Sequence, residues 1–215
     1  MKRLVPFSST LALCAAVAIA LSGCGHDGGG GISNKNPGNN DVNVVVAFGD
    51  SITQGSECPC TPYPARLAGL TGKSVANCGI GGSTAADNVG RTQSAIDKYH
   101  PGFMLILYGV NDVIHGHGAG SVSAAVSGMV SVCKANNVVP VVATYPLTIA
   151  GHRTFAGGVK AANEAIRAVA SANGIKCVDL EHEFAGREEQ WLMEDGLHPN
   201  DTGTQMMALA FADLF

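Results

Sequence analysis

The sequence lacks clusters of basic residues. Its 215 residues include 13 lysines and arginines against 17 aspartates and glutamates, for a formal net charge of −4. Proteins that bind nucleic acids neutralise phosphates with basic patches, so we expect no nucleic-acid partner. A dinucleotide-binding fingerprint is also missing, because Gly79-Ile80-Gly81-Gly82 does not have the G-x-G-x-x-G spacing.

Metal-binding spacings are absent as well. Cys58 and Cys60 form a Cys-Pro-Cys motif, but the second cysteine pair of a zinc ribbon is missing. His115 and His117 lie on a glycine-rich stretch without a third ligand, which is typical of solvated histidines. We therefore expect no metal site.

The apolar run at residues 11–21 is too short for a membrane span. It follows Lys2 and Arg3, the layout of an export signal. Leu21-Ser22-Gly23-Cys24 resembles the bacterial lipobox, in which the cysteine becomes the acylated first residue of the mature protein. Residues 1–24 are therefore predicted to be a lipoprotein signal peptide, the alternative being an ordinary secretory signal with a chance cysteine.

Residues 25–41 contain almost nothing apolar, which predicts a flexible Gly/Asn-rich tether. Residues 42–215 have the length of a single domain with its own core. We expect an exported, monomeric protein of the bacterial envelope that is held to the membrane through Cys24. The outer membrane or its periplasmic face is the expected site, with the cell surface as an alternative.

Apolar, β-branched runs alternate with helical patterns through residues 42–215. The predicted strands are 42–48, 74–78, 103–108, 138–144 and 175–180, and the predicted helices are 63–70, 84–99, 119–136, 155–173 and 202–214. Nearly continuous apolar strands separated by helices indicate a parallel sheet covered on both faces. The fold class is therefore α/β, a three-layer α/β/α sandwich with a five-stranded parallel sheet.

Polar blocks follow the first three strands. They are Gly49-Asp50-Ser51-Ile52-Thr53, Asn77 through Thr84, and Gly109-Val110-Asn111-Asp112. Ligands bind at the carboxyl ends of strands in open parallel sheets. We expect Asp50 and Asp112 to bond the backbone of their own loops as Asx turns.

A fourth block, Asp195-Gly196-Leu197-His198-Pro199, supplies an imidazole and a carboxylate. A serine hydroxyl becomes a nucleophile when a base takes its proton, and a carboxylate fixes the ring of that base. Asp195 can reach His198 if Gly196-Leu197 forms a tight turn. Backbone N–H groups and a carboxamide in the other blocks can hold a developing oxyanion.

Together the four blocks resemble those of the SGNH (GDSL-type) esterase/lipase family, over most of residues 42–215. The resemblance implies a flavodoxin-like strand order and ester hydrolysis through an acyl-enzyme, without a cofactor. It implies Ser51 as nucleophile, His198 as general base and then acid, and Asp195 as the partner of His198. The oxyanion donors it implies are the Ser51 N–H, the Gly82 N–H and the Asn111 carboxamide.

The family implies a small-molecule or glycan ester as substrate but does not select one. The first interpretation is a serine esterase for short or medium acyl chains. A second is a carbohydrate O-acetylesterase that acts on envelope or environmental polysaccharide. A third is a catalytically inactive surface-binding lipoprotein with the same fold.

Five cysteines lie in the predicted domain. A disulfide from Cys78 to Cys58 or Cys60 would join two active-site loops in an oxidising envelope. Cys133 and Cys177 lie in apolar helical and strand patterns, so we expect buried thiols.

Overall fold

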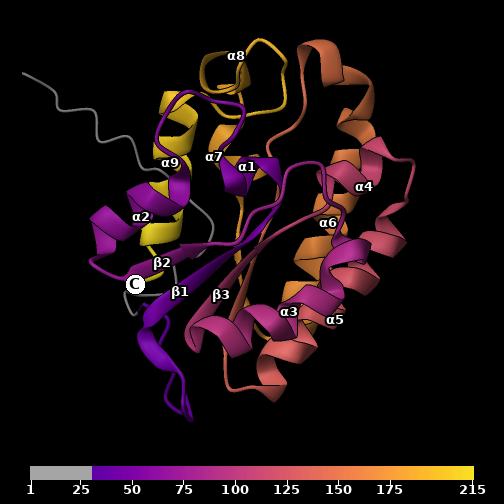
Figure 1. The fold of residues 1–215 in the computed structure, drawn as a ribbon. Helices are drawn as coiled ribbons and strands as arrows, with labels where there is room; N and C mark the ends of the chain where they lie inside the picture. The colour runs from indigo at the N-terminus through magenta and orange to yellow at the C-terminus, as the bar shows by residue number, and fades with distance from the viewer. Residues whose placement is uncertain (1–30) are drawn as a thin grey trace, which may run out of the picture. The chain divides into compact units, whose positions relative to one another are not determined.

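The computed structural model describes residues 31–215 (Figure 1). The predictions for the signal peptide, for Cys24 and for residues 25–30 of the tether lie outside these residues. None of the helices in the described part of the chain combines the length and the hydropathy that a membrane span requires.

Five parallel strands form one sheet in the order β2-β1-β3-β4-β5. The strands are β1 (Asp41–Gly49), β2 (Ser74–Asn77), β3 (Pro101–Leu107), β4 (Val139–Ala143) and β5 (Lys176–Val178). β3 lies in the middle of the sheet and is buried along its whole length. The predicted α/β fold class, the five parallel strands and the flavodoxin-like order are confirmed.

Helices cover both faces of the sheet (Figure 1). The five longer ones are α2 (Tyr63–Thr71), α3 (Ala85–Tyr99), α5 (Ala119–Ala135), α6 (Ala156–Asn173) and α9 (Asp201–Ala212). Each begins and ends within two residues of its prediction. In Figure 1, α2 and α9 pack together on one side of the sheet, and α3, α5 and α6 lie on the other.

The side chains of β1 show how the two cores are divided. Val45 and Ala47 pack into the cluster that contains residues of α2 and α9. Val46 and Phe48 pack into the cluster that contains residues of α3, α5 and α6. Because side chains alternate across a strand, one apolar run supplies both cores, which explains why β1 reads as continuously hydrophobic.

Short helices follow the strands and were not predicted. They are α1 (Ser51–Gln54), α4 (Val110–Ile114), α7 (Leu180–Phe184), α8 (Glu188–Trp191) and the 3₁₀ helix η1 (Ala150–Phe155). Four to six residues are too few to show a helical period in the sequence. α1 and α4 begin in two of the polar blocks, so the site is built on helix starts as well as on loops.

The chain before β1 differs from the prediction of a free tether through residue 41. Asn34 donates from Nδ2 to the carbonyl oxygens of Gly102 (3.0 Å) and Asn137 (2.6 Å). Ile32 donates its N–H to the carbonyl of Leu214 at 2.6 Å. Asn40 likewise donates from Nδ2 to the carbonyl of Asn136 at 2.7 Å. Two asparagines of the predicted tether are therefore hydrogen-bonded to the domain, and the folded unit begins at residue 31.

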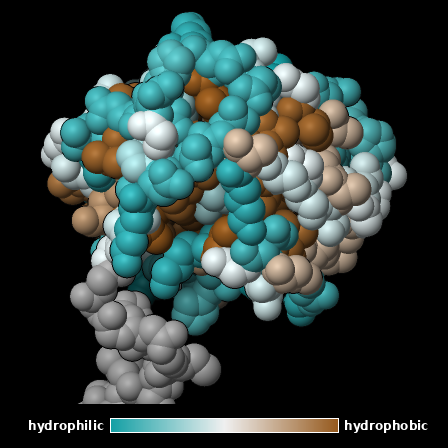
Figure 2. All heavy atoms as spheres, turned by 90° about the horizontal axis from the view of Figure 1, so that it is seen from below, coloured by the Kyte–Doolittle hydropathy of each residue, from teal (hydrophilic) through white to brown (hydrophobic). Residues whose placement is uncertain are grey.

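Figure 2 shows the domain from below the view of Figure 1. On this face hydrophobic residues lie in separate patches between hydrophilic ones. Among the described residues, the exposed large hydrophobic side chains are those of Val42, Leu70, Ile80 and Leu209. In residues 31–215 the large hydrophobic side chains therefore gather mainly in the two cores.

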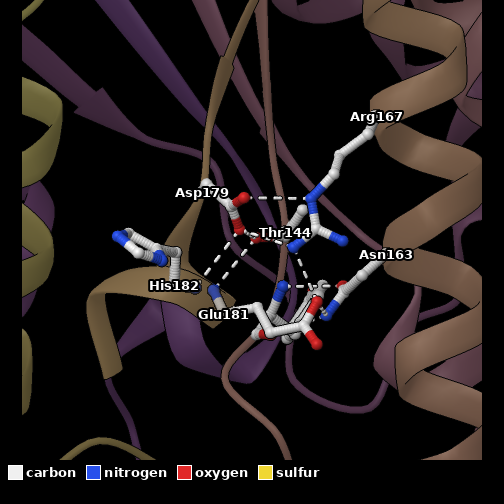
Figure 3. Close-up of polar contacts among 7 residues, drawn as sticks. Thr144, Asn163, Arg167, Asp179, Glu181 and His182 are labelled. Carbon is white, nitrogen blue, oxygen red and sulfur yellow. Dashed lines mark hydrogen bonds and ion pairs between the residues drawn. The ribbon is translucent and has the colours of Figure 1, made fainter. Parts of the chain in front are cut away.

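A polar network joins α6 to the carboxyl ends of β4 and β5 (Figure 3). Arg167 donates from Nε and Nη2 to the two carboxylate oxygens of Asp179, at 3.0 and 2.7 Å, and from Nη2 to Glu181 at 2.6 Å. Partial burial raises the pKa of Asp179, but hydrogen bonds from Arg167, Thr144 and the His182 N–H outweigh it and lower that pKa. The network thus holds a carboxylate pair on one guanidinium.

Asn163 is the buried member of this network. Its Oδ1 accepts the N–H of Tyr145 at 2.9 Å, and its Nδ2 donates to the Tyr145 carbonyl at 2.8 Å and to Glu181 at 3.0 Å. Asn163 is fully buried, so water cannot replace it. The backbone position of Tyr145, just after β4, is therefore fixed by a side chain of α6.

We expect Asn163→Ala to destabilise the protein by about 2–4 kcal/mol, because it leaves buried backbone groups of Tyr145 without partners. The measurement is the free energy of unfolding in urea. Glu164→Ala is the matched control, since Glu164 is exposed on the same helix; it should stay within about 0.5 kcal/mol of the parent. Equal midpoints for Asn163→Ala and the parent would contradict this role of Asn163.

Candidate active site

Ser51, His198 and Asp195 meet at the carboxyl end of the sheet. Ser51 Oγ lies 2.9 Å from His198 Nε2. His198 Nδ1 lies 2.5 Å from Asp195 Oδ2. The structure thus brings together three side chains whose first and last members are 147 residues apart in the chain.

Ser51 is presented by a sharp turn from β1 into α1. Asp50 accepts the N–H of Ile52 at Oδ1 (3.0 Å) and so caps the helix that Ser51 begins. A Cβ at Gly49 would lie 2.1 Å from Thr53 Oγ1 and 2.7 Å from the Leu107 carbonyl. Only glycine allows this close approach, so residue 49 determines where the hydroxyl of Ser51 is placed.

The carboxylate of Asp195 is held by hydrogen bonds within its own loop. Oδ1 accepts the N–H groups of Leu197 (2.9 Å) and His198 (3.1 Å), while Oδ2 faces the imidazole. Burial raises the pKa of Asp195, but these bonds from the His198 ring and the two N–H groups outweigh it and lower that pKa. Asp195 is therefore a carboxylate at neutral pH, which favours the tautomer with the proton on Nδ1 and leaves Nε2 to accept from Ser51.

Residues 149–155 support the turn between Asp195 and His198. Gly196 has φ +74°, and a Cβ there would lie 2.1 Å from the carbonyl of Ile149. The Ile149 N–H donates to the Gly196 carbonyl at 2.9 Å, and His152 Nδ1 lies 2.8 Å from the Asp195 carbonyl. Sequence reasoning missed Ile149 and His152, since neither lies in a recognisable block.

The second polar block packs directly against α1. A Cβ at Gly79 would lie 2.2 Å from the Gln54 nitrogen, and one at Gly81 would lie 3.9 Å from Ser51 Cβ. Gln54 Oε1 accepts the Gly81 N–H at 2.7 Å. Gly82, with φ +72° and open space around its Cβ position, is therefore carried by a loop that touches the nucleophile's helix.

Asn111 joins the second block to the first. Its Nδ2 donates to the carbonyl of Ser83 at 3.1 Å and to Asp50 Oδ2 at 3.3 Å. Ser83 follows Gly82 in the chain, and Asp50 precedes Ser51. The carboxamide nitrogen thus lies between the chain neighbours of the two other predicted oxyanion donors.

Of the two aspartates beside these residues, Asp50 forms the predicted Asx turn with the Ile52 N–H, but the prediction is wrong for Asp112, which bonds the start of α3 instead of its own loop. Besides capping α1, Asp50 accepts a hydrogen bond from the Tyr145 hydroxyl at 2.7 Å. Burial raises the pKa of Asp50 to about 6, although the bonds from Tyr145 and Ile52 and the nearby His198 lower it. Asp112 accepts the N–H of Ala85, at the start of α3, at 2.8 Å. Tyr145 was missed because nothing in the sequence around it distinguishes it from a core aromatic residue.

The predicted disulfide of Cys78 with Cys58 or Cys60 is wrong. Cys58 pairs with Cys60, and Cys78 is a free thiol. Cys78 packs against the core on the α3 side of the sheet, whereas Cys60 contacts Thr204 of α9 on the opposite side. The sheet therefore separates the cysteines that we expected to join. Cys133 and Cys177 are free thiols, the first buried and the second partly buried.

A small hollow of about 10 Å³, room for about one water molecule, opens beside the Ser51–His198 pair. Its other lining residues are Ile52, Gly55, Glu57, Cys58, Pro199 and Thr204. The residues thus come from α1, from the disulfide loop and from the start of α9. Across residues 31–215, no three His, Cys, Asp or Glu side chains gather in a way that could hold a metal ion, and His115 and His117 are exposed.

We expect Gly196→Ala to lower ester hydrolysis by at least about tenfold, because its Cβ would push the Asp195 turn away from Ile149 and shift the imidazole. Gly186→Ala is the matched control: Gly186 also has a positive φ, +75°, but its Cβ would meet nothing within 4 Å. Steady-state kinetics and thermal unfolding of both variants check this. If Gly196→Ala and Gly186→Ala lose the same stability and keep the same activity, the contact of Gly196 with Ile149 does not set the position of His198.

Comparisons with known proteins agree with this fold. The family model for the GDSL-like Lipase/Acylhydrolase family matches residues 47–206. A G-D-S-L family protein from Desulfitobacterium hafniense DCB-2 superposes with a TM-score of 0.70 at 24% identity, over 80% of this chain and 99% of that one. The lipase/acylhydrolase from Enterococcus faecalis gives a TM-score of 0.66 at 20% identity, over 79% and 93%.

One curated relative is similar in sequence over a shorter stretch. It is the uncharacterized lipoprotein YqeF of Bacillus subtilis (strain 168), 36% identical over 76 residues. The match covers 32% of this chain and 31% of that relative, so the chain spans about a third of its length. The family model extends over all four polar blocks and from β1 to α9. The chain therefore belongs to the GDSL-like lipase/acylhydrolase family, whose members hydrolyse ester bonds.

Proposed function

We propose that this protein is a serine esterase that cleaves carboxylic esters of short or medium acyl chains through an acyl-enzyme. The observation that carries the proposal is the 2.9 Å contact of Ser51 Oγ with His198 Nε2. On the other side of the ring, His198 Nδ1 lies 2.5 Å from Asp195 Oδ2. This arrangement gives one hydroxyl a base, and the base an orienting carboxylate.

The proposed reaction begins when His198 Nε2 takes the proton of Ser51 and Oγ bonds to the ester carbonyl carbon. The N–H groups of Ser51 and Gly82 and the carboxamide of Asn111 hold the oxyanion. The carbon–oxygen bond to the alcohol then breaks, and His198 returns the proton to the departing oxygen. A water molecule, deprotonated by His198, then attacks the acyl carbon. The bond from that carbon to Ser51 Oγ breaks, His198 returns the proton to Oγ, and the carboxylic acid leaves. Each step uses residues of this chain alone.

The hollow beside Ser51 favours a small acyl group. Its volume of about 10 Å³, room for about one water molecule, lies far below the range of about 300–1,000 Å³ that is usual for pockets that enclose drug-sized ligands. Cys58 and Thr204, on two of its walls, come from the disulfide loop and α9. A long acyl chain would have to leave this hollow for solvent.

The small size of the hollow also supports a second candidate, a carbohydrate O-acetylesterase. Acetyl is the smallest acyl group that is common on sugars, and the alcohol side of the ester would lie toward solvent. The two candidates share the chemistry at Ser51 and differ only in the alcohol.

We also propose that the protein is exported and lipid-anchored at Cys24. The lipobox-like Leu21-Ser22-Gly23-Cys24 supports this, as does the name of the relative YqeF, a lipoprotein. The anchor would place the esterase in the cell envelope, where acylated polysaccharides and lipids are available as substrates.

We expect Ser51→Ala and His198→Ala each to lower kcat by about 10⁴-fold, since the two groups act as a unit. Ser121→Ala and His115→Ala are matched controls, because both residues are exposed and have no part in the proposed reaction. Hydrolysis of p-nitrophenyl acetate by the purified proteins checks the expectation. Substantial turnover by folded Ser51→Ala would remove Ser51 as the nucleophile.

A panel of p-nitrophenyl esters from acetyl to dodecanoyl should show kcat/KM falling by about tenfold or more beyond four carbons, if the small hollow holds the acyl group. Ser51→Ala serves as the blank for every ester. Acetylated xylan and acetylated peptidoglycan, assayed by acetate release, separate the two candidates. Rates that rise steadily with chain length would contradict the assignment of the hollow as the acyl site.

A further inference from the structure

A chain of buried polar contacts lies directly beneath the nucleophile's turn. The hydroxyl of Tyr145 donates to Asp50 Oδ2 at 2.7 Å, and the same oxygen accepts from Asn111 Nδ2 at 3.3 Å. Tyr145 is 1% exposed, Asp50 0% and Asn111 7%. None of these contacts is needed for the proton transfers between Ser51, His198 and Asp195.

We propose that Asp50 and Tyr145 are positioning residues that hold the Asn111 carboxamide with its nitrogen toward the oxyanion. This inference rests on the proposed function, in which Asn111 is an oxyanion donor. Asp50 acts through Asn111, and Tyr145 acts through Asp50.

A carboxamide needs such positioning contacts because its oxygen and its NH₂ group are similar in shape, but the oxygen accepts hydrogen bonds whereas the NH₂ group donates them. Only the nitrogen end donates, so a flip of the group would turn a donor to the oxyanion into a repelling acceptor. Both groups that Asn111 Nδ2 contacts, the Ser83 carbonyl and the Asp50 carboxylate, are acceptors. They select the orientation with the nitrogen inward, and a flipped amide would place its oxygen against both.

Tyr145 in turn fixes the acceptor. Of the two oxygens of Asp50, Oδ1 is held by the Ile52 N–H, and Oδ2 by the Tyr145 hydroxyl. The Tyr145 backbone is itself held by Asn163 through two hydrogen bonds. The hydroxyl also lies 2.9 Å from the carbonyl of Leu107, the last residue of β3, so it spans the ends of β1 and β3.

The lengths of the contacts agree with this assignment. The Tyr145–Asp50 bond of 2.7 Å has the usual length of an O–H···O hydrogen bond, whereas the Asn111 contacts of 3.1 and 3.3 Å lie at and just beyond the long end of the N–H···O range. A weakly held N–H can be shared with a third acceptor, as in bifurcated bonds. Asn111 can therefore turn one N–H toward the oxyanion without losing its orientation.

The experiment uses Tyr145→Phe and Asp50→Asn in the full chain. We expect Tyr145→Phe to lower kcat about tenfold and Asp50→Asn about 10²-fold, with KM within about threefold, since the lost interaction acts only on the oxyanion. Tyr63→Phe is the matched control: Tyr63 is equally buried, and its hydroxyl contacts Thr53 Oγ1 at 3.2 Å. Its kcat should stay within about twofold of the parent.

The decisive readout repeats both substitutions in an Asn111→Ala background. Asn111→Ala alone should lower kcat by about 10² to 10³-fold. In that background Tyr145→Phe and Asp50→Asn should cost less than about twofold more, because the group that they position is gone. A merely structural role would leave their full losses in place, and that result would overturn the inference.

The outcomes separate the two proposals. If Asn111→Ala keeps full activity, the oxyanion role within the proposed function fails. If Asn111→Ala is impaired and the losses simply multiply, the proposed function stands and the positioning inference fails. Near-UV circular dichroism verifies folding of each variant. Should Tyr145→Phe not fold, the cycle between Asp50→Asn and Asn111→Ala decides the question alone.

Discussion

The hydrogen bond between Ser51 and His198 is the interaction on which the rest of the site depends, because it joins the end of the first strand to the loop before the last helix. The sheet carries one partner and α9 follows the other. Because the strands are parallel, the carboxyl ends of the neighbouring strands β1, β2 and β3 lie on the same side of the sheet. The serine and the oxyanion loops, which follow these strands, are therefore neighbours. His198 is brought to these strand ends by the packing of α9, the helix that follows it. Met207, Ala208 and Phe211 of α9 are fully buried in the core that includes residues of α2 and β1.

Behind the reacting groups lie polar contacts that begin at the partly exposed Arg167 and are buried at Asn163, Tyr145 and Asp50. Arg167 holds Glu181, Glu181 accepts from Asn163, and Asn163 holds the backbone of Tyr145, whose hydroxyl reaches Asp50. Apolar packing tolerates small shifts, whereas hydrogen bonds in a buried network lose much of their energy when distance or angle changes. A continuous line of such bonds from α6 to the nucleophile's turn therefore suits a site in which donors must be aimed accurately.

The fold was predictable from sequence because β1, β3 and β4 contain largely buried apolar runs, as in Val44–Phe48, and the buried residues of helices such as α6 recur with helical spacing. The residues of the triad were predictable because their types and spacing are set by chemistry. Tyr145, Asn163 and His152 were not, since a buried tyrosine, a mid-helix asparagine and a loop histidine have no distinguishing neighbours. The Cys78 pairing failed for a related reason: proximity along the chain does not reveal on which face of the sheet a side chain lies.

Two aspartates flank the nucleophile, and their surroundings move their pKa values in opposite directions. Hydrogen bonds lower that of Asp195, whereas burial raises that of Asp50 to about 6. The hydrogen bonds of ionised Asp195 therefore stabilise the folded state above pH 3.8, the usual pKa of an aspartate. This contribution is lost as the pH falls through the lowered pKa of Asp195. Burial of Asp50 favours the fold while its carboxyl is neutral, and this contribution is lost as pH rises through about 6. Between about pH 4 and 6, Asp50 gains a proton while Asp195 stays ionised. The carboxylate on the base side thus keeps the charge that stabilises an imidazolium over this range, whereas the Asp50 acceptor of the Asn111 amide is fully ionised only above it.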